Sequence, residues 1–568
     1  MAFALMKLPA SALLFLSFAF ALQAQAPSTR PKPEPSKRDE CSIAGMVVKL
    51  AGSEPIKNAT VQLLSTEDHA KSTSITTDVG GRFLLKGIFP GRYRLNISKN
   101  GFVDQEYGQR KPGDPGSILT LHPGQDMRDL VFRMIPSAVI SGRILNEDGE
   151  PFPFVAVSAL REIYANGKRK LSSEAEFQTN DLGEYRLFGL PPGRYFVSAI
   201  HRGRSRGFQV PQARPTTEGP EMGYGRLYYP GTPDAAKATA LTVRAGDEIS
   251  SVEILLRRFP VYRVSGRIFN LVPRRSGRAV NLTLVRRASN WEWEPDDQAV
   301  DVVGTPEDTF EIHDVLPGSY NLMAYLFEDD ARYVSRTNIE VTNSDLEGVT
   351  VVVSPGMNIS GRLVWDGPPC TIEGELRVTP WPVDPGGAFI RSVKVQAPGA
   401  TFALTNVSEG TYRPRVSGLS KDCFTKDVQY GGVSSLEEGF TVARSTSSLL
   451  EITLSSRGAH LQGSVVDADN LPAAGVWVVL VPDAKHRSRY ELFRSQATDQ
   501  YGHFDFRGLP PGEYKLFSWE EVETNAWQDP DFLQPFEDKG ERVELKESDQ
   551  KSVSLVAIRR AAAGDNQH

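Results

Sequence analysis

The chain has 568 residues, too many for one hydrophobic core, so several domains are expected. Its 64 basic and 70 acidic side chains leave a formal net charge of −6, which gives no broad basic face for nucleic acid. Three cysteines are too few for a scaffold built from disulfides.

The first 24 residues have the pattern of a secretory signal peptide. Lys7 precedes the apolar run Leu8–Leu22, and small residues follow in the segment QAQA. A membrane anchor is the alternative, but the run is shorter than the ~20 apolar residues that a spanning helix needs. We therefore expect cleavage near Ala24 and export through the inner membrane of a bacterium, to the periplasm, the cell surface or the medium. Residues 25–40, rich in proline and serine, are predicted to form an extended linker.

Two short phrases recur along the rest of the sequence. An opening phrase occurs five times, at Ile43–Val48 (IAGMVV), Ile140–Leu145 (ISGRIL), Val264–Phe269 (VSGRIF), Ile359–Val364 (ISGRLV) and Leu461–Val466 (LQGSVV). A closing phrase follows each of them, at Thr77–Leu95, Asn180–Ala199, Phe310–Leu322, Phe402–Arg415 and Thr498–Leu516. The repeat predicts five small domains, here named unit 1 (residues 41–135), unit 2 (136–259), unit 3 (260–355), unit 4 (356–456) and unit 5 (457–568).

Within a unit the apolar residues alternate with polar ones. In the second closing phrase Tyr185 and Leu187 point to one side, and Glu184 and Arg186 to the other. Short strands with one buried face, frequent Gly/Pro turns and little helical pattern are typical of β-sandwiches. The predicted fold class is all-β, a tandem array of about five small sandwiches.

The closing phrase has the chemistry of a scaffold. Its acidic or amide residue can bond the backbone two residues on, and the glycine three residues after it supplies the positive φ of a hairpin turn; the pairs are Asp78 and Gly81, Asn180 and Gly183, and Asp499 and Gly502. Calcium is the alternative role for these acids, but a site needs about six converging oxygens and each unit supplies one or two carboxylates. No metal or other cofactor is therefore expected.

These residues resemble the carboxypeptidase regulatory-like domain. The resemblance rests on the opening phrase, on Asp148–Pro151 (DGEP) and on the closing L-P-P-G-x-Y; it is most complete in units 2 and 5, clear in unit 1 and weaker in units 3 and 4. It implies a transthyretin-like sandwich of seven strands, close to carbohydrate-binding-like folds, and an accessory or carbohydrate-binding role. Tyr228–Pro233 (YYPGTP) and Leu119–Gly124 (LTLHPG) are similar to phrases of exported repeat proteins of acidobacteria.

No catalytic motif is present in the sequence. None of the eight histidines begins His-x-x-Glu, and neither Gly-x-Ser-x-Gly nor a phosphate-binding Gly-x-x-x-x-Gly-Lys loop occurs. We therefore expect a chain without enzyme activity. If any disulfide forms, Cys370 and Cys423 are the favoured pair because both lie in unit 4, which leaves Cys41 as a small buried residue.

Aromatic residues in expected loops are the candidate ligand-binding groups. Trp291 and Trp293 alternate on one strand face beside carboxylates, and Tyr228 and Tyr229 are adjacent; further candidates are Tyr224, Trp381, Trp519 and Trp527. A flat ring can stack on a sugar while its polar tip stays wet, although each ring could instead cover the core of its own unit.

The favoured function is accordingly a non-catalytic exported protein that binds a polysaccharide or another cell-envelope component. The alternative is a structural spacer or adhesive stalk, which could bind another envelope protein at exposed sheet edges. No nucleic-acid partner is expected. No stretch after the signal has 18 consecutive apolar residues, so no membrane span is expected in the mature chain.

Overall fold

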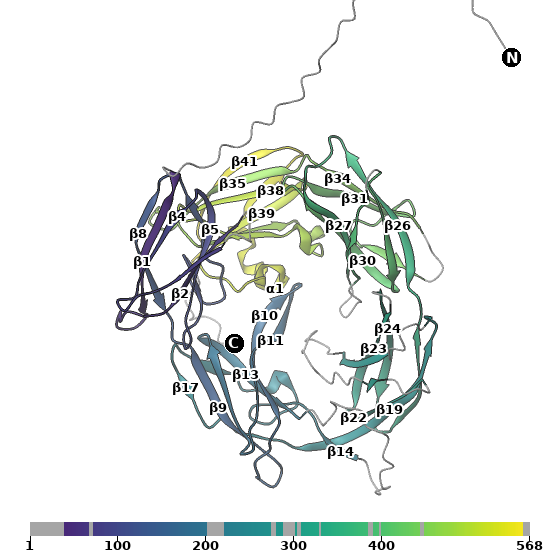
Figure 1. The fold of residues 1–568 in the computed structure, drawn as a ribbon. Coiled ribbons are helices and arrows are strands. Elements are labelled where there is room, and N and C mark those ends of the chain that lie inside the picture. The colour runs from purple at the N-terminus through teal and green to yellow at the C-terminus, as the bar shows by residue number, and fades with distance from the viewer. Residues whose placement is uncertain are drawn as a thin grey trace, which may run out of the picture.

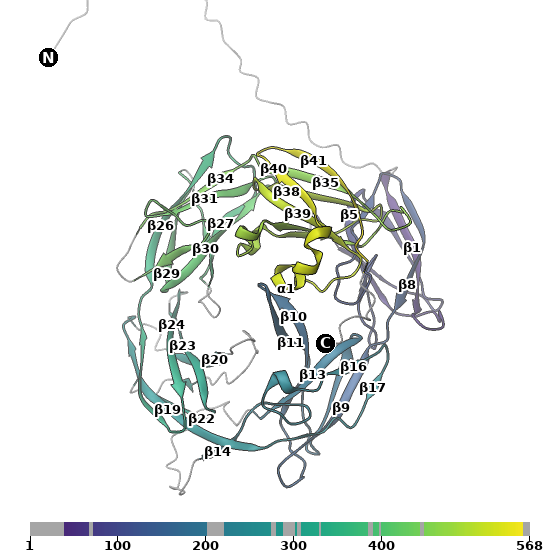
Figure 2. The ribbon, with the colours of Figure 1, turned by 180° about the vertical axis from the view of Figure 1, so that it is seen from behind.

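The structure is a computed structural model that describes residues 39–66, 72–201, 221–273, 280–287, 302–303, 308–328, 331–383, 390–396, 399–443 and 448–559. Over these residues the chain is almost entirely β-strand, arranged in ten sheets. Figures 1 and 2 show that the units follow one another around a ring. The predicted all-β fold of tandem sandwiches is confirmed, and the array is closed rather than extended.

All five units share one strand order. In one sheet the opening strand lies between the last strand of the unit, which is parallel to it, and the strand of the closing phrase, which is antiparallel. The second sheet pairs the remaining strands, and it lies on the inner side of the ring, whereas the sheet with the opening strand lies on the outer side (Figure 1). The two sheets are called the outer and inner sheet below.

Unit 1 shows this plan in its simplest form. Its outer sheet has the order β4-β1-β8, and its inner sheet has the order β3-β2-β5, with β6 and β7 both paired to β5. The strands are β1 (Cys41–Lys49), β2 (Thr60–Ser65), β3 (Ser72–Thr76), β4 (Arg82–Ile88), β5 (Gly91–Ser98), β6 (Gln105–Glu106), β7 (Leu119–Leu121) and β8 (Asp126–Met134).

Unit 2 adds a long hairpin to the plan. The hairpin turns at Asn166-Gly167, where both residues have positive φ, as a two-residue turn between paired strands requires. The strands are β9 (Ala138–Leu145), β10 (Ala156–Ala165), β11 (Lys168–Gln178), β12 (Glu184–Leu190), β13 (Gly193–Ile200), β15 (Leu227–Tyr228), β16 (Leu241–Val243), β17 (Glu248–Ile249) and β18 (Ile254–Leu255), with the 3-10 helix η2 (Ala235–Lys237).

The outer sheet of unit 3 includes a strand from the sequence range of unit 2. β14 (Glu221–Tyr224) lies within the range expected for unit 2, but it pairs antiparallel with the start of β19 in the outer sheet of unit 3. The other strands are β19 (Arg258–Asn270), β20 (Asn281–Arg286), β21 (Val302–Val303), β22 (Thr309–Val315), β23 (Gly318–Glu328), β24 (Ala331–Val341) and β25 (Leu346–Val353). Units 2 and 3 are therefore joined by sheet hydrogen bonds as well as by the chain.

Unit 4 widens its outer sheet with a second hairpin. β31 covers the edge of β34, and the disulfide between Cys370 and Cys423 ties the start of this hairpin to the segment before β27; Cys41 stays unpaired and buried, as predicted. The strands are β26 (Met357–Asp366), β27 (Ile372–Pro382), β28 (Val393–Lys394), β29 (Thr401–Val407), β30 (Gly410–Leu419), β31 (Phe424–Tyr430), β32 (Val433–Ser434), β33 (Phe440–Val442) and β34 (Leu450–Ser455).

Unit 5 carries a short helical insertion that the sequence pattern did not predict. Asp529 caps the first turn by accepting from the backbone N–H of Asp531, and Pro530 fills the first helical position. The elements are β35 (Ala459–Val466), β36 (Trp477–Pro482), β37 (Arg494–Ala497), β38 (His503–Leu509), β39 (Gly512–Trp519), β40 (Glu541–Leu545), β41 (Gln550–Val556), α1 (Pro530–Leu533) and the 3-10 helices η3 (Ala484–His486), η4 (Tyr490–Leu492), η5 (Ala526–Gln528) and η6 (Gln534–Lys539).

Each unit buries its own core between its two sheets. In unit 1, Ile43 of the outer sheet and Val61 and Leu95 of the inner sheet are fully buried. Burial of each such aliphatic side chain contributes about 1.5–3 kcal/mol to folding. Unit 5 has a second core around its insertion, which includes Trp519 and Trp527 and is joined by Tyr164 from the hairpin of unit 2.

The ring is closed by contacts that unit 5 makes with units 1 and 2. Gln500 exchanges two hydrogen bonds with the backbone of Thr120, at 2.9 and 3.2 Å. The Tyr490 hydroxyl donates to the Asn166 carbonyl at 2.8 Å, so the β10–β11 hairpin reaches across the interior to the insertion (Figure 2). Among the described residues, no helix is long and apolar enough to span a membrane.

The closing phrase acts as the predicted scaffold in units 1, 2 and 5. Asp78, Asn180 and Asp499 each accept from the backbone N–H groups two and four residues later, at 2.8–3.0 Å, and the glycine of each turn has positive φ. The tyrosine after the second turn donates to the carbonyl four residues earlier in every unit; these tyrosines are Tyr93, Tyr195, Tyr320, Tyr412 and Tyr514. The phrase thus locks two turns.

Candidate functional site

The aromatic residues singled out from the sequence lie in different environments. Trp291 and Trp293 lie outside the described residues. Tyr228 is 2% exposed and packs against Leu160 and Leu171, so its ring has no open face for a sugar. Tyr229 is partly buried against the core of unit 2. Of these four residues the structure describes only the two tyrosines, and the pair Trp291 and Trp293 stays a prediction.

The further tryptophan candidates also separate. Trp519 and Trp527 are 2% and 1% exposed and hold the second core of unit 5, where they stack with ring centroids 6.5 Å apart. Trp381, in contrast, is 39% exposed as a residue. It lies on β27, in the inner sheet of unit 4, where Figure 1 shows this sheet facing the interior of the ring. Among the sequence candidates that the structure describes, Trp381 is thus the exposed one.

Strand alternation decides which side chains accompany Trp381. On β27 and β30, Val378 and Tyr412 point into the core of unit 4. The residues between them point to the opposite, inner face, because successive side chains of a strand alternate. This inner face consists of Arg377, Thr379, Trp381, Lys394, Arg413, Arg415 and Ser417.

The Arg415 guanidinium stacks on the indole of Trp381. Its central carbon lies 4.0 Å from the ring centroid, and the two residues are diagonal neighbours across the β27–β30 ladder. Burial lowers the pKa of Arg415, and the Glu491 carboxylate acts in the opposite direction. An arginine keeps its charge through such a change, so the stack presents a fixed positive charge.

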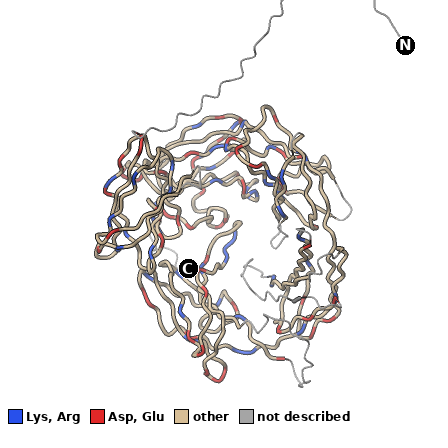
Figure 3. Tube along the Cα trace, in the orientation of Figure 1, with Lys and Arg blue, Asp and Glu red and all other residues tan. Residues whose placement is uncertain are grey.

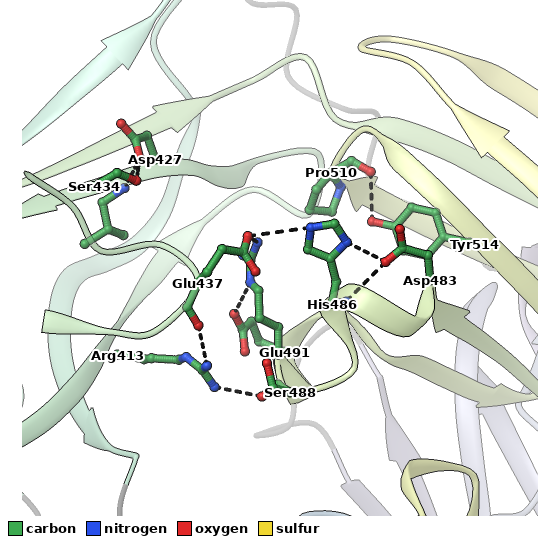
Figure 4. Close-up of polar contacts among 12 residues, drawn as sticks. Arg413, Asp427, Ser434, Glu437, Asp483, His486, Ser488, Glu491, Pro510 and Tyr514 are labelled. Carbon is green, nitrogen blue, oxygen red and sulfur yellow. Dashed lines mark hydrogen bonds and ion pairs between the residues drawn. The ribbon is translucent and has the colours of Figure 1, made fainter. Parts of the chain in front are cut away.

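Arg413 connects this face to unit 5. Its two terminal nitrogens donate to the Ser488 carbonyl at 2.8 Å and to the Glu437 carbonyl at 2.6 Å (Figure 4). Beside it, the buried Arg489 bridges the carboxylates of Glu437 and Glu491, at 3.0 and 2.9 Å. The joint between units 4 and 5 therefore holds the inner face in place through several charged hydrogen bonds.

The same joint contains a histidine between two carboxylates. His486 Nδ1 lies 2.5 Å from Asp483, and its Nε2 lies 3.8 Å from Glu437 (Figure 4). Nucleophilic catalysis needs one ring nitrogen against a serine or cysteine, whereas both nitrogens of His486 face carboxylates. In the part of the chain that the structure describes, no group of three His, Cys, Asp or Glu side chains is placed to hold a metal ion.

A cleft of about 190 Å³ adjoins the inner face at the junction of units 3 and 4. Pro382 and Thr411, which flank the Trp381 end of the face, belong to its lining, together with Tyr333, Ser335, Arg336 and Asn406. Hydroxyl, amide and guanidinium groups beside an aromatic ring are the groups that orient a polar ligand. The inner face and the cleft together are the candidate site.

The cationic part of this site was missed in the sequence. Polar residues alternate with apolar ones in RVT (377–379) and in TYRPRVS (411–417), which predicts strands with one wet face. Nothing local distinguishes a face toward open solvent from one toward the interior of a ring. The hairpin that crosses this interior did have a local signal, Asn166-Gly167 between alternating strands.

Comparison with known proteins supports the domain type. The family model of the carboxypeptidase regulatory-like domain matches residues 42–134, which lie in unit 1. No curated protein matches the chain. Unit 1 therefore carries the match, although the repeated phrases are most complete in units 2 and 5.

Solved structures with similar parts include bacterial pilins. The minor pilin GBS52 of Streptococcus agalactiae is 15% identical, with 42% of this chain and 99% of that chain covered and a TM-score of 0.22. A streptococcal ancillary pilin is 13% identical over 56% of this chain and 99% of its own, with a TM-score of 0.19. These scores are too low to inform function. Residues 42–134 match the carboxypeptidase regulatory-like domain, and the other four units repeat the strand order of this segment.

Proposed function

We propose that this chain is a non-catalytic exported binding protein and that it binds carbohydrate at the inner face of unit 4 and the adjoining cleft. The observation that supports this most directly is the exposed position of Trp381 on a strand of the inner sheet, beside a polar cleft. An exposed indole offers an apolar face to the C–H groups of a sugar, and the surrounding hydroxyl, amide and guanidinium groups can bond its hydroxyls.

Export is proposed from the sequence of residues 1–24. The absence of catalysis is proposed from the missing motifs and from the position of His486.

The closed ring bears on the alternative role as a stalk. A spacer keeps its two ends apart, but here units 1 and 5 lie against each other and share hydrogen bonds. The arrangement suits a compact binding body better than an extended spacer.

The test is retention of residues 25–568 on a panel of insoluble and gel-embedded polysaccharides, with and without calcium. We expect saturable retention on one glycan and its loss in Trp381→Ala. Phe188→Ala is the matched control, because Phe188 is 62% exposed on the outer sheet of unit 2 and should not contribute. Absence of retention on every glycan, or equal retention by the Trp381 variant, would refute this function.

A protein-binding role is the second candidate, and the sheet edges favour it. In the described residues β8, β25 and β41 lie at the edge of their outer sheets, whereas the equivalent β34 of unit 4 is covered by β31. An open edge can accept a strand from a partner. Cross-linking to an envelope protein, blocked by proline substitutions in β25, would support it; retention that depends only on a glycan would count against it.

A further inference from the structure

The inner face of unit 4 is cationic in a chain that is acidic as a whole. The chain has a formal net charge of −6. Yet Arg377, Lys394, Arg413 and Arg415 share one face of two paired strands and a short edge strand. Cations gathered on one side of a sheet repel one another, so a face of this composition is more stable when an anion binds to it.

The carboxylates near this face neutralise only part of its charge. Arg377 and Lys394 are both paired with Glu375, the lysine at 2.9 Å. Arg413 donates to two backbone carbonyls, which carry no net charge. Arg415 stacks on Trp381, and no carboxylate within the described residues lies within ion-pair distance of it. Within the described residues, neither the Arg413 nor the Arg415 guanidinium is therefore bonded to a carboxylate.

The remaining acids of the joint are already occupied. Glu437 lies against both Arg489 and His486, and Glu491 accepts from Arg489 at 2.9 Å. These carboxylates therefore hold unit 5 against unit 4, and Glu491 acts on Arg415 only from beyond ion-pair distance. The inner face of unit 4 therefore still attracts an anion from solution.

The hairpin of unit 2 adds cations inside the ring. Lys168, Arg169 and Lys170 lie at the start of β11, next to its turn. Figure 3 shows basic residues along the segment that crosses the interior and on the inner strands of unit 4. An anionic chain that passes within about 8–10 Å of either set of cations would be attracted by it, because charges at such distances are not fully screened at physiological salt.

We propose that the inner face of unit 4 binds an acidic polysaccharide built from uronic acids; this rests on the carbohydrate-binding function proposed above. A planar guanidinium bonds a carboxylate through two parallel N–H groups, and the exposed indole beside it supplies an apolar surface for the sugar ring. Arg415 would bond the carboxylate, while Thr379 and Ser417 on the same face would bond ring hydroxyls.

The test compares polygalacturonate with its fully methyl-esterified form, which has the same backbone without the charges. The full mature chain should bind the acid and lose most affinity for the ester, and raised salt should weaken binding to the acid. Arg415→Gln should weaken binding to the acid about tenfold or more. Arg267→Gln, at an exposed arginine on the outer strand β19, should bind like the unchanged chain.

Other outcomes separate this inference from the proposed function. Equal affinity for acid and ester, with loss in Trp381→Ala, would refute the anionic ligand and keep carbohydrate binding. Equal binding of polyglutamate would replace the glycan by an acidic polypeptide and refute the inference. No retention on any glycan would refute both. Circular dichroism of each variant checks that it is folded, so that a loss of binding is not a loss of structure.

Discussion

Units 1, 2 and 5 differ from units 3 and 4 at the turn of the closing phrase. In the first group an Asx turn and a glycine form the turn, for example Asn180 and Gly183. In the second group Asp308 and Ala400 occupy the glycine position with φ of 56° and 50°. Their carbonyls still accept from the opening strand, at 2.6 and 2.8 Å, as the glycines do in the first group.

The comparison shows which features of the turn the fold requires and which features only lower the strain of the turn. The positive φ and the backbone hydrogen bond are present in all five units. Glycine adopts this φ without strain, whereas an alanine or aspartate there costs about 1–2 kcal/mol. The two groups also differ in position, because units 1, 2 and 5 make the contacts that close the ring.

The largest expected effect lies at a glycine common to both groups. A Cβ on Gly45 in β1 would lie 2.4 Å from the Leu130 carbonyl oxygen of the neighbouring β8, so Gly45→Ala must move backbone. We expect unit 1 to lose about 3 kcal/mol, read by hydrogen exchange with peptide-resolved mass spectrometry. Gly80→Ala, whose Cβ has no contact shorter than 3.4 Å, is the control; equal losses in both variants would contradict the close-approach explanation.

Exchanging the turn residues between groups should give effects of opposite sign. Gly81 has φ +70°, and a Cβ there would lie 2.5 Å from the Val47 carbonyl oxygen, so Gly81→Ala should destabilise unit 1 by about 2 kcal/mol. Ala400→Gly should stabilise unit 4 by about 1 kcal/mol, because it removes the strain at φ 50°. The same exchange measurement reads both, and a destabilised Ala400→Gly variant would show that the alanine is not strained.

Removal of an Asx acceptor should cost less than either glycine change in unit 1. Asn180→Ala loses two backbone hydrogen bonds at an exposed turn, for an expected loss of about 1 kcal/mol. Asn180→Asp keeps the acceptor oxygen but loses the hydrogen bond from the Asn180 amide to the Glu184 carboxylate, at 3.2 Å, so it should cost less than Asn180→Ala without being neutral. If Asn180→Ala left the exchange rates of unit 2 unchanged, the Asx turn would be dispensable, and units 3 and 4 would need no compensation for lacking it.

The smallest effect concerns the ring-closing joint, which only the first group makes. Asp114 of unit 1 is buried beside unit 5; burial raises its pKa to about 6, Lys111 opposes this, and Glu521 and Glu523 add to it. A raised acid pKa favours the folded joint as pH falls through 6 and weakens it above 6. The melting temperature should rise slightly from pH 7.5 to 5.5, and Asp114→Asn should remove that part of the rise. An identical rise in the variant would exclude Asp114 as its source.

Local patterns predicted the strands and turns well. Period-two alternation and the turn residues Asp78, Asn180 and Asp499 depend only on nearby chain, and the strands and turns formed as expected. The pairing of Cys370 with Cys423 followed from their place in one unit. The strands and turns of each sandwich depend on residues close together in the sequence, so a repeated phrase was enough to predict this fold.

Contacts between units were not predictable in the same way. Tyr164, Trp519 and Trp527 meet only because a hairpin of unit 2 reaches the insertion of unit 5, more than 300 residues later. The pairing of β14 with β19 likewise crosses a unit boundary. The face around Trp381 and Arg415 is directed to the interior of the ring only because the ring closes, and no short sequence pattern predicts that closure.

The joint between units 1 and 5 also decides how the chain would respond to tension. It lies between the two ends of the array, so a pull on those ends loads it before the sandwiches. It is held by few bonds, among them the Gln500–Thr120 pair and a partly exposed Lys111–Glu523 contact of 3.3 Å. If the contacts between the unit 2 hairpin and unit 5 broke as well, the ring would open into a line of sandwiches. The chain would then gain length while the core between the two sheets of each unit stays folded.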